Sequence, residues 1–251
     1  MPVINLSLLD ILLLLLAPAV GSFLGVLALR LPAGEDVILK RSCCDNCQHA
    51  LRPLDMVPLL SWLALGGKCR HCATPIPAVL PLLEAGAVFL ALLAIWRMPS
   101  DVQALTGAGF LWCLLVLFVI DLTHFRLPDV LTGAVFVLGC LLALLDPWRG
   151  LDSALIGAIA GAGSFWLIRI AYARLRGREG LGMGDVKLMA GLGAGLGAQA
   201  LPLLVLLAAL GALAWAGAQA LRQNTSLQAR TALPFGSFLC LAAGILLLGN
   251  A

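Results

Sequence analysis

The sequence is poor in charged side chains: Asp, Glu, Lys and Arg together make up 12% of its 251 residues. Soluble proteins carry about 25%. Hydrophobic residues instead reach 61%, and a soluble fold of this length cannot bury so much apolar surface. The chain also lacks a basic stretch interleaved with aromatic residues, so nothing in it indicates nucleic acid as a partner. The protein is therefore predicted to lie in a lipid bilayer, and the predicted fold class is an all-α polytopic membrane protein.

No basic segment precedes the first apolar run, residues 3–29. A secretory signal peptide begins with such a segment. Here Asp10 lies near the start of the run, and Arg30 follows its end. Because basic residues flank the cytoplasmic ends of spanning helices, we expect a first membrane helix with its N-terminus outside and Arg30 inside.

Eight segments approach the length of about 20 apolar residues that a membrane-spanning helix needs. They are residues 4–29, 78–96, 104–122, 129–146, 152–171, 184–199, 201–221 and 232–250. Gln199 and Pro202 divide the sixth from the seventh, and a single broken helix is the alternative there. In this topology every Lys and Arg except Arg97 and Arg149 lies on the inner side, as the positive-inside rule expects.

The predicted topology divides the chain into three parts. Residues 1–29 form the first transmembrane helix, residues 30–77 a cytoplasmic tetracysteine domain, and residues 78–251 a seven-helix membrane core. The middle part holds five of the eight cysteines and is too small and polar to fold alone. We therefore expect a bound metal to stabilise it.

Four of these cysteines form two Cys-x-x-Cys pairs, with 21 residues between the pairs. Two such turns bring four thiolates to one tetrahedral centre, a pattern typical of zinc. Four sulfur ligands leave no open position, so the predicted zinc is structural. Disulfides are the rival interpretation, which a loop facing the reducing cytosol disfavours. Cys43, His49 and His71 lie beside the pairs and are alternative ligands. The predicted ligands are Cys44, Cys47, Cys69 and Cys72.

Two aspartates lie at the predicted inner ends of membrane helices. Asp121 ends the third span, and Asp185 opens the sixth in the sequence Gly-Met-Gly-Asp. Carboxylates at such positions are costly and therefore indicate function. When two face each other they share a proton: the ionised member takes a proton from water, and the protonated member polarises a peptide carbonyl. The pair predicts an aspartic peptidase. The alternative is that each aspartate caps a helix or pairs with a basic neighbour.

Two further carboxylates lie close to the membrane. Asp129 follows Pro128, is predicted to cap the fourth span, and is the fallback catalytic candidate. Glu84 lies inside the second span. It is expected either to bind a cation or a substrate amine, or to form a hydrogen bond between helices.

Five ordered segments resemble the type IV prepilin peptidase family, the bacterial membrane aspartic peptidases with a GxGD motif. The segments are Gly21-Ser-Phe-Leu-Gly25-Val-Leu-Ala-Leu-Arg30-Leu-Pro32, Pro58-Leu-Leu-Ser61-Trp62-Leu, Pro81-Leu-Leu-Glu84, Asp121 with Leu127-Pro128-Asp129, and Gly182-Met-Gly184-Asp185-Val-Lys187-Leu. The resemblance implies that Asp121 and Asp185 are the catalytic pair. It also implies that the four paired cysteines are the family's cytoplasmic tetracysteine site.

By this resemblance, the substrates are prepilins and pseudopilins with a short basic leader and an apolar helix. The enzyme is expected to cleave the leader at the cytoplasmic face of the inner membrane, after a Gly and usually before a Phe. It is then expected to N-methylate the new terminus with S-adenosylmethionine. Such substrates serve type IV pili, type II secretion or DNA uptake. The chain shows no glycine-rich Rossmann-type loop, so the cofactor-binding residues are unknown and methylation rests on the resemblance alone.

Two other functions also use carboxylates in a membrane. An intramembrane protease of the presenilin or signal-peptide-peptidase kind shares the Asp and GxGD chemistry, but the tetracysteine loop and the interfacial position of both aspartates argue against it. A proton- or cation-coupled transporter is the other alternative. An inverted repeat favours transporters, and the sequence shows none.

Overall fold

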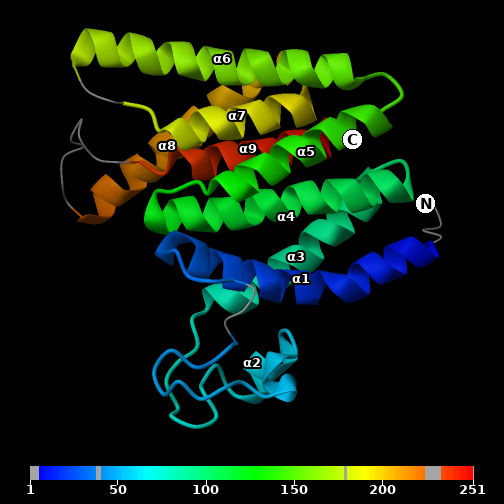
Figure 1. The fold of residues 1–251 in the computed structure, drawn as a ribbon, viewed down its shortest axis with the longest axis vertical. Coiled ribbons are helices and arrows are strands. Elements are labelled where there is room, and N and C mark those ends of the chain that lie inside the picture. The colour runs from blue at the N-terminus through cyan, green and yellow to red at the C-terminus, as the bar shows by residue number, and fades with distance from the viewer. Residues whose placement is uncertain (1–5, 38–40, 178–179, 224–232, 251) are drawn as a thin grey trace. The chain divides into compact units, whose positions relative to one another are not determined.

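The computed structural model describes residues 6–37, 41–177, 180–223 and 233–250. The predicted span limits at residues 4 and 232 lie outside these ranges. Over the described ranges the regular structure is helical and contains no strand, only two isolated β-bridges in the tetracysteine loop (Figure 1). The predicted all-α fold class is confirmed. The chain forms two compact units, Met1–Ala108 and Gly109–Ala251.

Five helical segments are long and apolar enough to cross a membrane, and two shorter apolar helices accompany them. The long segments are α1 (Leu8–Ala33), α3 (Val79–Arg97), α4 (Asp101–His124), α6 (Leu151–Arg176) and Ala198–Arg222, which contains most of α8 (Leu201–Gln223); the shorter helices are α5 (Asp129–Leu145) and α9 (Phe235–Asn250). A further helix, α7 (Met183–Leu196), has 14 residues and is about 21 Å long, against about 30 Å of hydrocarbon. The polytopic fold is supported, while the count of eight spans and the three-part domain division stay predictions.

In the first unit, α1 and α3 pack closely because two glycines of α1 face α3. A Cβ atom on Gly21 would lie 2.5 Å from the Cα atom of Glu84, and one on Gly25 would lie 2.6 Å from Leu80 Cδ2. The two helices therefore lie so close together that no side chain larger than that of glycine fits at these positions. Small residues four positions apart permit such close packing of membrane helices. The loop that joins them contains two short helical turns, η1 (Pro53–Met56) and α2 (Leu60–Ala64).

In the second unit, α7 lies against α5, α6 and α9 (Figure 1). A Cβ atom on Gly191 would lie 2.8 Å from Val135 Cγ1 of α5. One on Gly193 would collide with the backbone of Gly157 in α6. These backbone-level contacts bury more than half of the residues of α7 and fix the place of the helix end that carries Asp185.

A break separates α7 from α8, at Gly197 with φ +84° and the short turn η2 (Ala198–Ala200). The break coincides with the predicted divide between the sixth and seventh spans. Arg149 donates hydrogen bonds from Nη1 to the Gly195 carbonyl at 2.7 Å and from Nη2 to the Ala194 carbonyl at 2.9 Å. Carbonyls in the last turn of a helix lack intrahelical partners, so Arg149 stabilises this end of α7.

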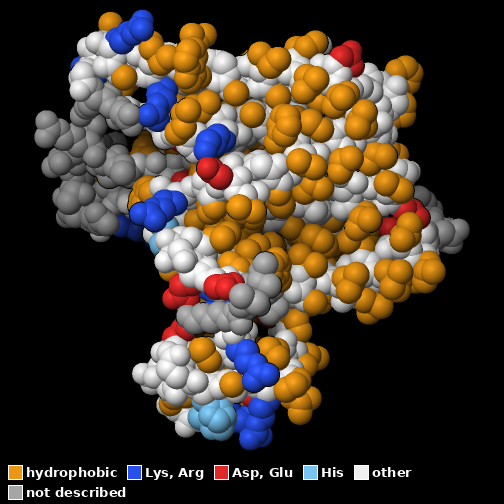
Figure 2. Space-filling view, viewed as in Figure 1, with side chains coloured by type: hydrophobic (Ala, Val, Ile, Leu, Met, Phe, Trp, Pro, Cys, Tyr) orange, Lys and Arg blue, Asp and Glu red, His pale blue; other side chains and the backbone are white. Residues whose placement is uncertain are grey.

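Apolar side chains cover the visible sides of the helices (Figure 2). On α6, for example, Ile156, Ile159 and Leu167 are all exposed, a surface suited to lipid. In the second unit, Lys and Arg side chains gather at the end where α4 and α6 end and α7 begins (Figure 2). The two features together indicate helices that cross a bilayer and meet water at that end.

Candidate active site and metal centre

Asp121 is a buried carboxylate near the C-terminal end of α4, 6% exposed. Its Oδ2 atom accepts two hydrogen bonds, from the backbone N–H of Ser237 at 2.6 Å and from the Ser237 hydroxyl at 3.0 Å. The same hydroxyl lies 3.0 Å from the Phe118 carbonyl oxygen, and its single proton serves either acceptor. Asp121 is thereby tied to α9, 116 positions later in the chain.

The N-terminus of α9 faces this carboxylate. Ser237 is the third residue of α9, and N–H groups in the first turn of a helix have no intrahelical acceptor. They also form the positive end of the helix dipole, which attracts negative charge. A Cβ atom on Gly236 would lie 3.1 Å from Asp121 Oδ2. The glycine therefore lets α9 bring its donors against Asp121.

Asp185 is the third residue of α7 and is half-buried. The geometric link between Asp185 and Asp121 runs through a shared neighbour of the glycines beside them, Gly184 and Gly236. Leu127, from the connection between α4 and α5, touches both supporting helices. A Cβ atom on Gly184 would lie 2.9 Å from Leu127 Cβ, and one on Gly236 would lie 2.9 Å from Leu127 Cδ1. The structure thus brings the two predicted catalytic residues together at the meeting ends of α4, α7 and α9.

Asp129 has a different environment. Its side chain is 71% exposed, and its Oδ1 atom lies 2.7 Å from Lys187 Nζ. Pro128 is the N-cap of α5 and Asp129 is the first helical residue, so the expectation that Asp129 caps this helix is wrong. The ion pair joins the start of α5 to the start of α7, two positions beyond Asp185.

Ser237 and Gly236 carry no signature of an active site in the sequence. The sequence indicates only that a helix starts here: Pro234-Phe-Gly-Ser precedes the last apolar segment, and a proline followed by small residues is typical of a helix N-terminus. Arg169 of α6 is a second unpredicted contributor. Its Nη1 donates to the Leu181 carbonyl at 2.9 Å and so holds the segment that leads into α7.

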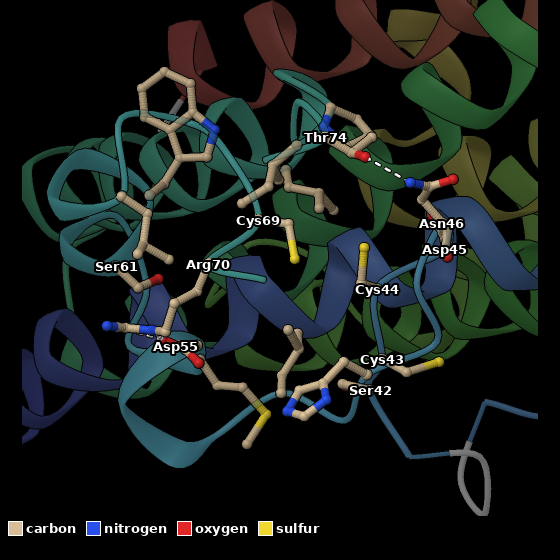
Figure 3. A pocket seen from close by; sticks show the side chains of 18 of the residues that line it. Ser42, Cys43, Cys44, Asp45, Asn46, Asp55, Ser61, Cys69, Arg70 and Thr74 are labelled. Carbon is tan, nitrogen blue, oxygen red and sulfur yellow. Dashed lines mark hydrogen bonds and ion pairs between the residues drawn. The ribbon is translucent and has the colours of Figure 1, made fainter. Parts of the chain in front are cut away.

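The four predicted metal ligands converge in the first unit, with all their Sγ atoms within 4.8 Å of one another. The sulfurs of Cys44 and Cys72 are 3.7 Å apart, and those of Cys47 and Cys69 are 4.0 Å apart. A tetrahedral zinc ion with Zn–S bonds of about 2.3 Å separates its ligands by about 3.8 Å. In Figure 3 the sulfurs of Cys44 and Cys69 face each other. The donor set and its spacing fit zinc.

Both Cys-x-x-Cys pairs are held by the same backbone pattern. The Gln48 N–H donates to the Cys44 carbonyl at 2.8 Å, and the Ala73 N–H donates to the Cys69 carbonyl at 3.0 Å. Gln48 and Ala73 have positive backbone φ angles of 54° and 57°, which residues other than glycine rarely adopt. The repetition presents two equivalent pairs of thiolates, as a tetrahedral site requires.

The alternative ligands lie outside the four-sulfur cluster. Cys43 Sγ lies 3.5 Å from Gln48 Oε1 and points away from Cys44 in Figure 3. The rings of His49 and His71 contact each other, with centroids 3.6 Å apart and the ring planes tilted by 38°. The histidines therefore join the two cysteine turns through their rings.

Polar contacts brace the tetracysteine loop. Cys72 Sγ lies 3.3 Å from Thr74 Oγ1, and hydrogen bonding with the Thr74 side chain and backbone lowers the pKa of Cys72 to about 5, which favours the thiolate that a metal binds. Asn46 Nδ2 donates to Thr74 Oγ1 at 2.8 Å, and Figure 3 shows this contact. Arg70 pairs with Asp55 at 2.7 Å, and its hydrogen bond holds the pKa of Asp55 below the usual range.

Glu84 of α3 anchors the same loop. Its Oε2 atom accepts a hydrogen bond from the Leu59 N–H at 2.7 Å, and Glu84 is buried. Leu59 has φ 61° and ψ −49°, and the Leu60 N–H donates to the Pro58 carbonyl at 2.6 Å. This is a γ-turn of the strained, positive-φ form. Of the roles expected for Glu84, a hydrogen bond is observed, although its donor is loop backbone instead of another helix.

Known proteins match this chain over most of its length. A family model described as "Bacterial Peptidase A24 N-terminal domain" matches residues 15–98, and one described as "Type IV leader peptidase family" matches residues 108–217. The boundary between the two compact units, after Ala108, falls at the start of the second match.

Several curated relatives are named prepilin leader peptidase/N-methyltransferase. The protein of Aeromonas hydrophila is 40% identical over 214 residues, which are 85% of this chain and 73% of the relative. That of Burkholderia pseudomallei (strain 1026b) is 41% identical over 220 residues, covering 85% and 68%. That of Pseudomonas aeruginosa is 36% identical over 259 residues, covering 94% and 88%. No solved structure matches the chain significantly.

Proposed function

This chain belongs to the type IV leader peptidase family, and we propose that it removes the leader from prepilins and pseudopilins with Asp121 and Asp185 as its catalytic pair. The enzyme is a membrane peptidase and N-methyltransferase. The observation that carries the proposed site is the convergence of the ends of α4, α7 and α9, where Leu127 contacts both Gly184, next to Asp185, and Gly236, which lies against Asp121.

The surroundings of the two carboxylates suggest different starting roles. Asp121 receives two hydrogen bonds from Ser237 and the N-terminus of α9, so it is the better place for the negative charge. Asp185 then holds the shared proton and polarises the scissile carbonyl, while Asp121 takes a proton from the attacking water. The roles exchange as the amine leaves, and the pair titrates as a unit.

The proposed substrates have a short basic leader followed by an apolar helix, cut after a Gly and usually before a Phe. Such a helix enters the bilayer and leaves its junction at the surface, where the helix ends with Lys and Arg also meet water. By the positive-inside rule we infer that this surface faces the cytoplasm. We propose the same side of the inner membrane for the tetracysteine loop, because Arg30 follows the first span.

Zinc is the proposed metal of the tetracysteine site, held by the two Cys-x-x-Cys pairs. With four thiolates bound it serves structure, because no position is left for substrate. S-adenosylmethionine is the proposed methyl donor for the terminal amine that cleavage exposes. That amine is part of the scissile amide until the peptide bond is cut, so methyl transfer follows cleavage and uses the unprotonated amine.

Cleavage of a prepilin by the purified protein in detergent tests the catalytic pair. Asp121→Asn and Asp185→Asn are each expected to abolish leader removal, measured by gel shift and mass spectrometry, because neither Asn can hold or accept the shared proton. Asp152→Asn, on the exposed first turn of α6, is the matched control. Retained cleavage by either catalytic-pair variant would refute the assignment and move attention to Asp129. A wild type that leaves several prepilins uncut would refute the peptidase function itself.

A further inference from the structure

The stretch between the two cysteine pairs, residues 53–67, is strongly apolar although the loop is expected to lie in water. Asp55 is its single charged residue, and Arg52 and Lys68 flank the stretch. Asp55 pairs with Arg70 at 2.7 Å, which leaves the Asp55 side chain 6% exposed. An apolar stretch too short to span a bilayer either packs in a protein core or enters the membrane interface. We propose that residues 53–67, with η1 and α2, enter the cytoplasmic leaflet and contact its acyl chains.

The large side chains of this segment are not packed in a core. Leu54, Leu60 and Leu63 are each at least 66% exposed, and Met56 and Val57 are exposed as well. Figure 2 shows hydrophobic side chains over the place of α2, at the edge of the loop toward the N-terminal half of α1, with Lys, Arg and His side chains beside them. Exposed apolar surface of this kind marks a protein or membrane contact. Basic residues at its border fit a lipid surface.

The contact between α2 and α3 gives the level of α2 in the bilayer. α3 has 19 residues and is about 28 Å long, so its whole length is needed to cross about 30 Å of hydrocarbon. Glu84 lies five residues after Val79, the first residue of α3, and therefore about 7 Å into the bilayer. The Leu59 N–H donates to Glu84 Oε2 at 2.7 Å. The start of α2 thus lies near this level, within the leaflet.

The neighbouring helix α1 leads to the same level. Gly21 faces Glu84, because a Cβ atom on Gly21 would lie 2.5 Å from Glu84 Cα. Arg30, which is expected at the cytoplasmic surface, follows nine residues later, about 13 Å along the helix. In Figure 1, α2 lies beside α1 between its two ends and not beyond its C-terminal end. The apolar side chains of α2 therefore lie at a depth where acyl chains also cover exposed side chains of α1 such as Phe23.

The backbone of this segment meets the condition for lying in lipid, which is that polar groups have partners within the protein. Pro53 and Pro58 have no N–H to satisfy. The N–H of Leu59 has the carboxylate of Glu84 as its acceptor. Backbone carbonyls accept from the N–H groups of Leu60, Ser61, Leu63, Leu65, Gly66 and Gly67. A carboxylate inside a span is costly, and here Glu84 satisfies a turn that has no acceptor of its own.

Insertion of residues 53–67 ties both cysteine pairs to the membrane surface, because Cys47 and Cys69 lie on either side of the segment. The rival occupants of the apolar side chains are the apolar helix of a substrate and a second copy of this chain. The level of α2 in the bilayer and the basic residues at both ends of the segment favour lipid. The experiments below separate the three.

Fluorescence quenching tests the contact in nanodiscs of phosphatidylglycerol and phosphatidylethanolamine with brominated acyl chains. An environment-sensitive fluorescent amino acid replaces Leu63 in the full-length, zinc-loaded protein. It is expected to lose roughly half of its fluorescence to bromine, because an interfacial segment is buried about 5–10 Å into the headgroup and acyl boundary. The same probe at Ile159, exposed on α6, is the quenched control, and at Ala50, exposed in the same loop, the unquenched one. A Leu63 probe that iodide quenches and bromine does not, like the Ala50 probe, overturns the proposal.

Proteolysis with chymotrypsin, which cuts after large apolar residues, gives an independent readout in the same nanodiscs. Lipid is expected to protect residues 53–67 of the wild type and of the apolar control Leu60→Phe/Leu63→Phe. Leu60→Glu/Leu63→Glu places two carboxylates in the leaflet and is expected to release the segment and allow cleavage within it. Zinc content shows that the loop of each variant is folded. Equal cleavage of the wild type and both variants overturns the proposal.

Two additions distinguish the rival occupants. Loss of bromine quenching at Leu63 when uncleaved prepilin is added assigns the apolar surface to the substrate. Energy transfer between Leu63 probes of two copies in one nanodisc, without bromine quenching, assigns it to a second copy. Either result overturns the proposal, and quenching that neither addition changes supports it. The measurement does not depend on which side of the membrane is cytoplasmic, so its failure is distinct from a failure of the proposed topology.

Discussion

Ser237 is expected to be necessary for full activity although it occupies no position in the catalytic pair. Ser237→Ala removes the hydroxyl that lies 3.0 Å from Asp121 Oδ2 and leaves the backbone N–H at 2.6 Å in place. A hydrogen bond to a charged group contributes about 1.5–3 kcal/mol. The hydroxyl also serves the Phe118 carbonyl, so the loss should lie near the lower figure, which is about a tenfold fall in rate.

Single-turnover leader removal is the measurement, because it reports the chemical step apart from product release. The rate should fall about tenfold in Ser237→Ala with KM unchanged, and Ser237→Thr should recover part of it. Ser164→Ala is the matched control, since that hydroxyl donates to the Gly161 carbonyl away from the carboxylates. A wild-type rate in Ser237→Ala would refute the reasoning that α9 prepares Asp121 for catalysis.

Two further predictions concern the tetracysteine loop. The Cys44→Ser/Cys69→Ser double variant should lose its zinc, because each pair then retains a single thiolate; full occupancy by elemental analysis would contradict the site. Ala73→Gly should stabilise the zinc-loaded loop by roughly 1 kcal/mol, because glycine adopts φ 57° without the strain of a side chain. Thermal unfolding of the full-length protein checks this, with Ala64→Gly in α2 expected to change stability in the opposite direction.

The sequence predicted those features that depend on neighbours along the chain. Hydropathy identified the long helices, and the spacing within each Cys-x-x-Cys pair identified the four cysteines whose sulfurs converge. The divide predicted from Gln199 and Pro202 was also found, and the structure has the break two residues before Gln199, at Gly197.

Contacts between distant segments were harder to foresee. Ser237 reaches Asp121 across 116 positions, and Glu84 reaches Leu59 across 25. Neither contact leaves a trace in periodicity, because each is set by how helices pack. The number of spans also depends on packing. The sequence of α7 consists largely of apolar and small residues, as in a membrane helix, but its 14 residues are too few to cross a bilayer.

The glycine contacts of α7 have a consequence for genetics. Gly157 and Gly193 meet backbone to backbone, and a methyl group on either would collide with the other helix. A saturation screen scored by leader removal would therefore identify both positions as strongly as the two aspartates, although neither glycine carries a group that could react. Immunoblotting separates the two classes: alanine at these glycines should deplete the enzyme from the membrane, whereas Asn at the aspartates should leave its abundance unchanged. Only the Asn variants of the two aspartates are expected to act as dominant negatives, because these folded but inactive enzymes still bind substrate.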